Sequence, residues 1–291
     1  MTRSADALAS LQERLAAASP TASLDAEILL AHVLGTSRAA LAAAPGRTLA
    51  PSQAWELEAL ALRRIVGEPV AYLTGRREFW SLDLEVTPAV LVPRPETELV
   101  IELALAALAG VSCPAVLDLG TGSGAIALAL ARERDDADVT AVDASTAALE
   151  VARRNARRLR IGNVRFLRGS WYVPVGTGRF NAIVSNPPYV AEGDPALATL
   201  AHEPREALVS GRDGLDAIAA ICAGASQHLV PGGRLFVEHG AAQGAAVREL
   251  LSAAGLGEVA THRDLGSRER VTAGTAPPQA LESAGGQESR Q

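Results

Sequence analysis

An Asn-Pro-Pro-aromatic run is the part of this sequence best suited to chemistry. Asn186, Pro187, Pro188 and Tyr189 directly follow a short apolar run, 182–184, that is typical of a buried strand. The Asn186 side-chain oxygen and the Pro187 carbonyl can accept both N–H groups of a planar amide or amino group, while the prolines stiffen the backbone. We expect Tyr189 to stack on that planar group. A plain strand-to-loop turn is the alternative, but the residue types favour methyl transfer to a planar nitrogen, driven by positioning and by stabilisation of developing charge.

A glycine-rich run earlier in the chain is the candidate cofactor loop. Gly120, Thr121, Gly122, Ser123 and Gly124 follow an apolar run and open an apolar helix over 125–131. Glycines permit a tight turn and let a ligand approach the helix N-terminus. Dehydrogenases use a similar loop for NAD, so that alternative stays open. The GxGxG alternation and the preceding Asp118 favour a cationic cofactor, S-adenosylmethionine, over a pyrophosphate.

Two further positions are candidates for the cofactor site. Asp143 ends the next apolar run, where a carboxylate can accept hydrogen bonds from ribose hydroxyls. The alternative for Asp143 is a helix cap beside Ser145. Trp171 follows the third apolar run and could lie against an adenine ring, with core packing as an equal alternative.

The alternation of elements predicts the fold. From Pro95 onward, short apolar runs alternate with helical stretches, which is typical of a doubly wound α/β sheet. A hairpin over 259–262 and 270–272 is expected to close the sheet. Ligands bind such sheets at the carboxyl ends of the strands, so the glycine loop, Asp143 and the tetrad should meet there. The expected parallel strands are 115–119, 139–142, 164–167, 182–184 and 235–237.

The remaining segments predict four parts of the chain. Residues 1–78 have helical periodicity and are expected to form a small all-α domain. Alternating Leu82, Leu84 and Val86 predict a β-hairpin linker over 79–94. Residues 95–274 hold the sheet, and the Ala-, Pro-, Gly- and Gln-rich segment 275–291 is expected to be disordered.

Composition excludes several classes of protein. The 291 residues carry 27 basic and 33 acidic side chains, a net charge of −6, so we expect no membrane partner and no nucleic-acid substrate. Every basic residue is Arg, which excludes Schiff-base lysines and the lysine P-loop. The five histidines and two cysteines show no metal-ligand spacing, and we expect no metal. Without a signal-peptide pattern or a long apolar run, the sequence predicts a cytoplasmic protein.

These motifs together resemble the bacterial release factor glutamine methyltransferases. The resemblance implies a Rossmann-like class I methyltransferase sheet behind a helical domain that docks the release factor. It also implies methyl transfer from S-adenosylmethionine to the side-chain amide nitrogen of the Gln in the Gly-Gly-Gln motif of class I peptide chain release factors. The residues that carry the resemblance are 25–30, 67–75, 78–80, 268–271 and above all Leu91-Val92-Pro93-Arg94-Pro95-Glu96-Thr97-Glu98.

The resemblance also assigns site residues and exposes two departures. It implies that residues 120–124, Asp143, Trp171 and Asn186 contact the cofactor, and that residues 186–189 hold the Gln. Ser170 stands where the family often has Asp beside the adenine. His202 stands where an aromatic residue usually precedes Glu-Pro.

Several alternatives stay open. An exocyclic adenine or guanine nitrogen would present the same planar geometry, so a nucleic-acid methyltransferase is the second candidate, and a non-catalytic binding protein is the third. Arg94, between two prolines, is expected either at the mouth of the site or in a structural loop. An arginine cluster between Arg153 and Arg168 is expected to be a solvated helix face, with a partner surface as the alternative. Gly285-Gly286-Gln287 repeats the family's substrate motif, which we interpret as coincidence rather than as a pseudosubstrate.

Overall fold

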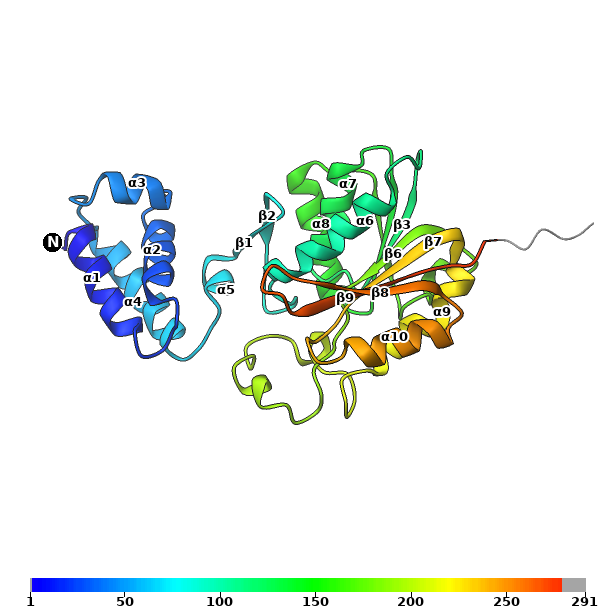
Figure 1. The fold of residues 1–291 in the computed structure, drawn as a ribbon. Coiled ribbons are helices and arrows are strands. Elements are labelled where there is room, and N and C mark those ends of the chain that lie inside the picture. Colours follow the sequence, from blue (N-terminus) through cyan, green and yellow to red (C-terminus); the bar gives the residue numbers. More distant parts are fainter. Residues whose placement is uncertain (1, 279–291) are drawn as a thin grey trace, which may run out of the picture.

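The N-terminal region is a small helical bundle. The computed structural model describes residues 2–278. Buried leucines from all five helices, including Leu11, Leu29 and Leu57, form the core of this bundle. Figure 1 shows the bundle beside the sheet, with α5 leading into the rest of the chain. Its helices are α1 (Ser4–Leu15), α2 (Ala22–Val33), α3 (Arg38–Ala43), α4 (Pro51–Ile65) and α5 (Val70–Thr74).

A β-hairpin follows the bundle, but earlier than expected. Strand β1 (Arg76–Phe79) pairs with β2 (Leu82–Glu85) in antiparallel register, with Arg76 opposite Glu85. The turn consists of Trp80 and Ser81, which both have positive φ, as tight hairpin turns require. The predicted span 79–94 was therefore wrong in position, and residues 89–92 form no strand. The alternating leucines lie on β2, and β2 pairs with the charged strand β1 that precedes it. Strand β1 has no alternating pattern of its own.

Helix α8 (Thr146–Leu159) fastens this hairpin to the sheet. Asn155 accepts a hydrogen bond from the backbone N–H of Glu85 at 2.7 Å and donates one to its carbonyl at 2.9 Å. Arg154 pairs with the Glu85 carboxylate at 2.8 Å, and Arg158 pairs with Asp83 at 3.0 Å. These contacts favour the interpretation of the arginine cluster as a helix face with local partners.

The rest of the described chain forms a seven-stranded sheet in the order β5-β4-β3-β6-β7-β9-β8. Five neighbouring strands are parallel, and β8 and β9 close the sheet as an antiparallel hairpin, as the sequence predicts. The strands are β3 (Ala115–Leu119), β4 (Asp138–Asp143), β5 (Val164–Arg168), β6 (Phe180–Ser185), β7 (Leu229–Glu238), β8 (Gly257–Arg263) and β9 (Glu269–Thr275). The helices are η1 (Pro95–Thr97), α6 (Glu98–Ala107), α7 (Ala125–Glu133), α8, η2 (Val173–Val175), η3 (Pro195–Ala198), η4 (Arg205–Ala207), α9 (Asp216–His228) and α10 (Gly244–Ala253).

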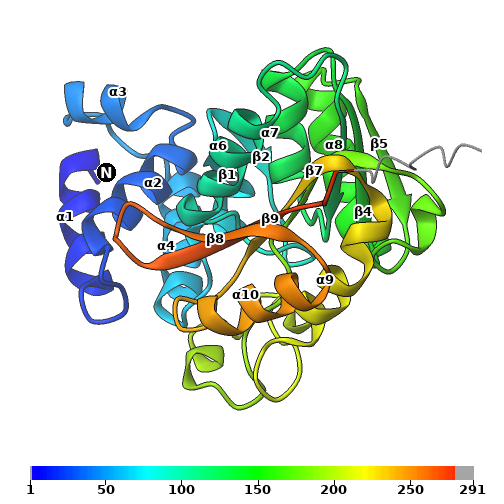
Figure 2. The same cartoon turned by 45° about the vertical axis from the view of Figure 1, so that its right-hand side comes forward.

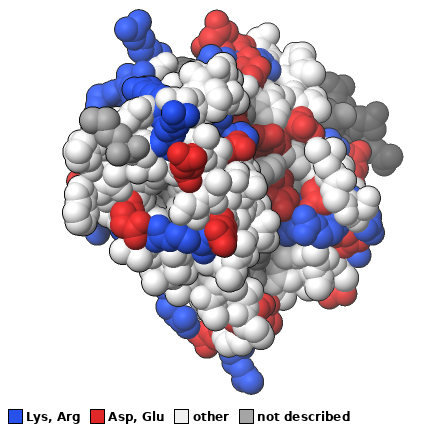
Figure 3. All heavy atoms as spheres, turned by 90° about the vertical axis from the view of Figure 1, so that its left-hand side faces the viewer, with Lys and Arg blue, Asp and Glu red and all other residues white. Residues whose placement is uncertain are grey.

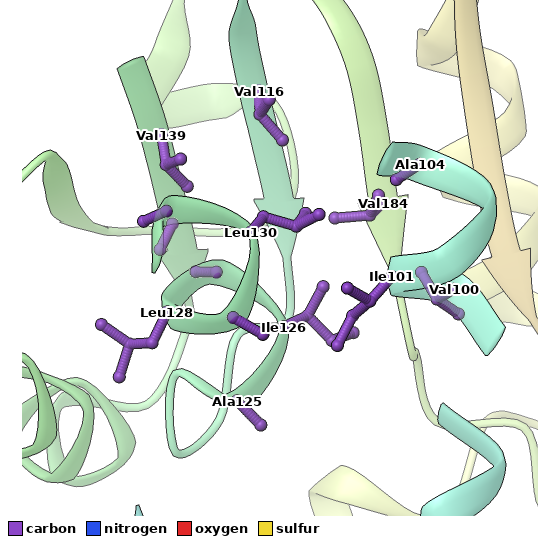
Figure 4. Close-up of a cluster of buried hydrophobic side chains, with 14 of the residues drawn as sticks. Val100, Ile101, Ala104, Val116, Ala125, Ile126, Leu128, Leu130, Val139 and Val184 are labelled. Atoms are coloured by element: carbon purple, nitrogen blue, oxygen red, sulfur yellow. The ribbon is translucent and has the colours of Figure 1, made fainter. Parts of the chain in front are cut away.

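Helices cover both faces of the sheet. Helices α6, α7 and α8 lie on one face, and α9 and α10 lie on the other (Figure 1). Val116 on β3 packs under α7 beside Leu130 (Figure 4), whereas the next residue, Leu117, packs on the opposite side with Ile221 of α9. Both faces of the central strands are therefore buried, which explains why these strands are continuous apolar runs in the sequence.

The last described residues correct one prediction. Thr275 is the end of β9, and Ala276 is buried with its N–H bonded to the carbonyl of Gly233 at 2.8 Å. The sheet therefore extends past the boundary expected at 274. Gly285-Gly286-Gln287 and the rest of 279–291 lie outside the described residues.

The order in which strands are added to the sheet reverses between β3 and β6. Strand β3 pairs with β4 on one side and with β6 on the other, so Leu119 lies opposite both Val142 and Ser185. The buried Ser185 hydroxyl donates to the Leu119 carbonyl at 2.7 Å and ties these two strand ends together. Three loops thus leave the sheet at one point, where α/β folds bind ligands.

Candidate active site

The glycine loop after β3 is held against the end of β4. Its three glycines have φ values of 75°, 55° and 84°, in the left-handed region that favours glycine. The N–H groups of Gly120 and Thr121 donate to the Val142 carbonyl at 2.9 and 3.0 Å. A Cβ on Gly124 would lie 3.1 Å from Leu128 and 3.2 Å from Ala152, so only glycine fits without displacement of neighbours. The N-terminus of α7 is thereby brought to the edge of the sheet.

Asp143 joins the glycine loop to the start of α8. Its Oδ2 accepts the Gly122 N–H and its Oδ1 accepts the Ser145 N–H, both at 2.8 Å. The Ser145 side chain is itself the cap of α8 and accepts the Ala148 N–H at 3.2 Å. Burial raises the pKa of Asp143, while these backbone donors lower it. The carboxylate therefore has the structural bonds expected of a cap and also lines the cavity described below.

Asp118 supports the loop from behind. It is fully buried, its Oδ2 accepts hydrogen bonds from Thr121 at 2.7 Å and from the Ala127 N–H at 3.2 Å, and its Oδ1 has no partner among the described residues. Burial raises its pKa to about 7. Asp118 does not line the cavity, so any effect on a bound cation acts through the loop.

A cavity of about 240 Å³ opens where these loops meet. Two carboxylates, Asp143 and Glu206, line it, whereas no Arg, Lys or His among residues 2–278 does. This charge distribution fits a cationic ligand and disfavours a pyrophosphate. The other lining residues are mostly small or apolar and include Leu91, Pro93, Ile126 and Ala148.

Trp171 and Ser170 lie on the wall of this cavity. Trp171 has a positive φ of 45°, and its ring would lie 3.8 Å from a Cβ placed on Gly120. The same ring packs against the buried cluster under α9. The Trp171 side chain therefore lines the cavity and also packs at the edge of the core, which are the two alternatives expected from the sequence.

The tetrad after β6 divides between the cavity and the core. Asn186 and Pro188 line the cavity, whereas Pro187 is buried and Tyr189 does not line it. The Asn186 Nδ2 donates to the Thr97 hydroxyl at 3.0 Å, and its Oδ1 is buried without a partner among the described residues. Tyr189 donates from its hydroxyl to Glu238 at 3.3 Å. The unpaired Asn186 oxygen is an acceptor available to a ligand N–H.

The loop after the tetrad reaches back to the helical bundle. His202 Nε2 lies 3.1 Å from the Val66 carbonyl at the end of α4, and Figure 2 shows this loop below α4. The adjacent Glu203 is buried and pairs with Arg94. Arg94 does not line the cavity. Its contact with Glu203 fits the second of the two roles expected for it, a structural role in the loop.

Sequence reasoning missed three side chains at this site. Glu206 lines the cavity, Thr97 contacts Asn186, and Glu238 contacts Tyr189. Glu238 ends β7, the strand next to β6, so its strand-end position was an available signal. Thr97 and Glu206 lie in the short helices η1 and η4, whose position in space no local pattern reveals.

Comparison with known proteins identifies the family. The model described as "Methyltransferase small domain" matches residues 99–259, and the one described as "PrmC N-terminal domain" matches residues 6–75. A release factor glutamine methyltransferase of Burkholderia pseudomallei is 52% identical over 268 residues, which are 89% of this chain and 94% of that relative. The chain belongs to the release factor glutamine methyltransferase family. A second member, from Xylella fastidiosa strain Temecula1, is 51% identical over 87% of this chain and 93% of its own length.

Solved structures confirm the fold of this family member. A methyltransferase from Pyrococcus furiosus aligns with a TM-score of 0.51 and 22% identity, covering 67% of this chain and 89% of its own. The 16S rRNA N2 G1207 methyltransferase of T. thermophilus, in complex with AdoMet and guanosine, aligns with a TM-score of 0.54 and 23% identity, covering 69% and 49%. Both share the α/β methyltransferase fold predicted here.

Residues 2–278 contain neither a membrane-spanning helix nor a cluster of metal-ligating side chains. No helix in this range is long and apolar enough to cross a membrane. No group of three or more His, Cys, Asp or Glu side chains in this range could hold a metal ion.

Proposed function

We propose that this chain methylates the side-chain amide nitrogen of the Gln in the Gly-Gly-Gln motif of class I peptide chain release factors. The observation that carries the proposal is the buried, unpaired Asn186 Oδ1 beside the cavity, because a carboxamide N–H is the donor it lacks. The family relatives at 52% and 51% identity are named for glutamine methylation of release factors, which supports this substrate.

S-adenosylmethionine, when bound, supplies a methyl group activated by its sulfonium charge. The glycine loop of this chain would hold that cofactor, because residues 120–123 line the cavity, although Gly124 does not, and Trp171 would lie beside the adenine. Asp143 would accept hydrogen bonds from the ribose hydroxyls. Asp143 and Glu206 give the cavity a negative potential, which favours a cation.

The tetrad would hold and orient the substrate amide. Asn186 Oδ1 and the Pro187 carbonyl accept its two N–H groups, so the nitrogen lone pair points away from them and toward the cavity. Pro188 lines the cavity, and Tyr189 would stack on the amide plane. A carboxamide nitrogen is a weak nucleophile, so these residues act by in-line positioning and by stabilising the positive charge that develops on nitrogen.

We assign the helical bundle, residues 1–75, to release-factor docking and residues 95–276 to methyl transfer, with the hairpin between them. Docking to nucleic acid is disfavoured by the net charge of −6. Figure 3, which views the molecule from the bundle side, shows Arg and acidic side chains interspersed rather than one basic area. Cys113 and Cys222 are both free, which supports a place in the reducing cytoplasm.

Mass spectrometry tests the proposal. The protein and S-adenosylmethionine are incubated with a class I release factor, with its Gly-Gly-Gln to Gly-Gly-Ala variant, and with tRNA and DNA. We expect one added methyl group on the Gln, none on the variant and none on nucleic acid. Methylation of nucleic acid alone would overturn the proposal in favour of an exocyclic-amino methyltransferase.

A further inference from the structure

The side-chain amide of Gln243 joins three loops that meet beside the tetrad. Gln243 lies just before α10, and its Oε1 accepts the backbone N–H of Gly240, shortly after β7, at 2.8 Å. Its Nε2 donates to the carbonyl of Tyr189, the last residue of the tetrad, and to the carbonyl of Asp213, in the loop before α9, both at 3.1 Å. A primary amide has one oxygen and two N–H groups, so Gln243 uses all of them.

These partners allow only one orientation of the Gln243 amide. The Gly240 N–H can only donate, and the carbonyls of Tyr189 and Asp213 can only accept. A flipped amide would therefore lose all three hydrogen bonds. The contact fixes the direction of the Tyr189 carbonyl as well as its distance from Gln243.

Gly214 makes room for this contact. Its φ is 79°, and a Cβ there would lie 2.2 Å from the Tyr189 carbonyl oxygen and 2.8 Å from Gln243 Nε2. Any residue but glycine would force these two groups to move. The segment after the tetrad is also paired, because the Val190 N–H donates to the Leu208 carbonyl at 2.8 Å.

The two prolines carry this constraint along the tetrad. Each proline ring fixes φ near −65°, so the backbone from Asn186 to Tyr189 has few free rotations. Asn186 is held at one end, where its Nδ2 donates to Thr97 at 3.0 Å, and Gln243 holds the carbonyl at the other end. With both ends fixed, the Pro187 carbonyl between them is held in one direction.

We propose that Gln243 and Gly214 are positioning residues that fix the tetrad backbone for substrate binding. Neither residue lines the cavity, so both act through the tetrad and not on the cofactor. This inference rests on the proposed function, because the direction of the Pro187 carbonyl matters to the reaction only if that carbonyl accepts a substrate N–H. The effect of the two residues should therefore be seen in methyl transfer and not in S-adenosylmethionine affinity.

Substitutions at both positions test the positioning role in the full chain. Gln243→Leu removes all three hydrogen bonds, whereas Gln243→Glu keeps the acceptor for Gly240 but, once ionised, has no proton to donate to Tyr189 or Asp213. We expect kcat for release-factor methylation to fall roughly 10- to 100-fold in both variants, with the calorimetric Kd for S-adenosylmethionine unchanged. Gly214→Ala leaves the Gln243 side chain intact and should lower kcat in the same way.

Asn163→Leu is the matched control. Asn163 is another half-buried amide, and it lies just before β5, whereas the tetrad lies at the carboxyl ends of the strands. Its Nδ2 donates to three backbone carbonyls, those of Ala131, Arg134 and Ala137. We expect Asn163→Leu to lower the midpoint of urea unfolding and to leave kcat unchanged. A purely structural amide at Gln243 would give that same pattern, so wild-type kcat in Gln243→Leu would overturn the inference, as would a loss of cofactor affinity as large as the loss of kcat.

Hydrogen exchange gives a readout that needs no substrate. The backbone N–H groups of Val190 and Gly240 should exchange with solvent faster in Gln243→Leu than in the wild type, and at the wild-type rate in Asn163→Leu. Unchanged exchange at both groups in Gln243→Leu would contradict the inference. If the wild type methylates no release factor while exchange rises as expected, the proposed substrate fails and the contact between Gln243 and the tetrad stands.

Discussion

The Glu203 carboxylate accepts the backbone N–H of Val92 at 3.0 Å, across 111 residues of sequence. Glu203 also pairs with Arg94, so one buried side chain holds the segment before α6 at two points. Leu91 and Pro93 of that segment line the cavity. The loop after the tetrad therefore fixes one wall of the cofactor cavity, and His202 links the same loop to the helical bundle.

Glu203→Ala should destabilise the protein. The substitution leaves the Val92 N–H buried without a partner and Arg94 unpaired, which costs about 2–4 kcal/mol of unfolding free energy. S-adenosylmethionine affinity should also fall, because the cavity wall loses its anchor. Urea unfolding and calorimetry measure both effects. Glu192→Ala, an exposed position on the same loop, is the control, and equal midpoints for the two variants would refute this account.

Asn186→Ala should abolish most methyl transfer and spare cofactor binding. Removal of one oriented polar group from an enclosed site lowers kcat by roughly 100- to 1,000-fold. The cofactor is held mainly by the glycine loop, Asp143 and Trp171, so its dissociation constant should change by only about threefold. Single-turnover methylation and calorimetry separate the two effects. A loss of affinity as large as the loss of rate would instead place Asn186 chiefly in the cofactor site.

Gly124→Ala and Gly122→Ala should differ in stability although the residues are neighbours. Both glycines have positive φ, which costs an alanine about 1–2 kcal/mol. At Gly124 the new methyl would also lie 3.1 Å from Leu128, whereas at Gly122 nothing lies within 4 Å. Overpacking should add about 1–3 kcal/mol at Gly124 alone. Urea unfolding of both variants measures the difference, and equal destabilisation would show that backbone strain dominates.

The sequence predicted most of the sheet because its signals are local. Strands β3, β4, β6 and β7 bury apolar residues on both faces, and the glycine loop and tetrad directly follow two of them. The hairpin was misplaced because Arg76–Phe79 lacks alternation and forms a strand only by pairing with β2. Thr97, Glu203 and Glu238 escaped prediction for a related reason. Their partners lie in distant loops, and only the tertiary fold brings them together.

Glu238 should make stability depend on pH. Burial is the largest cause that raises its pKa, from an ordinary value near 4.5 to about 7, although Thr97, Tyr189 and Arg270 lower it and Glu96 raises it further. In the folded protein the proton is therefore retained at pH values where the unfolded chain has lost it. Folding is favoured most below pH 4.5, and this contribution is lost progressively as the pH rises to about 7. The whole loss amounts to up to about 3 kcal/mol.

Glu238→Gln has no proton to lose, so it should lack this dependence. Relative to the wild type, its unfolding free energy should rise between pH 5 and pH 8 by up to about 3 kcal/mol. Asp118, whose pKa burial also raises to about 7, contributes equally to both proteins and cancels in the comparison. Urea unfolding at several pH values measures the difference, with the exposed Glu249→Gln as control. If the wild-type and Glu238→Gln curves stay parallel, the Glu238 carboxyl is ionised throughout, and its charge in the fold must be balanced by Arg270 and the donors around it.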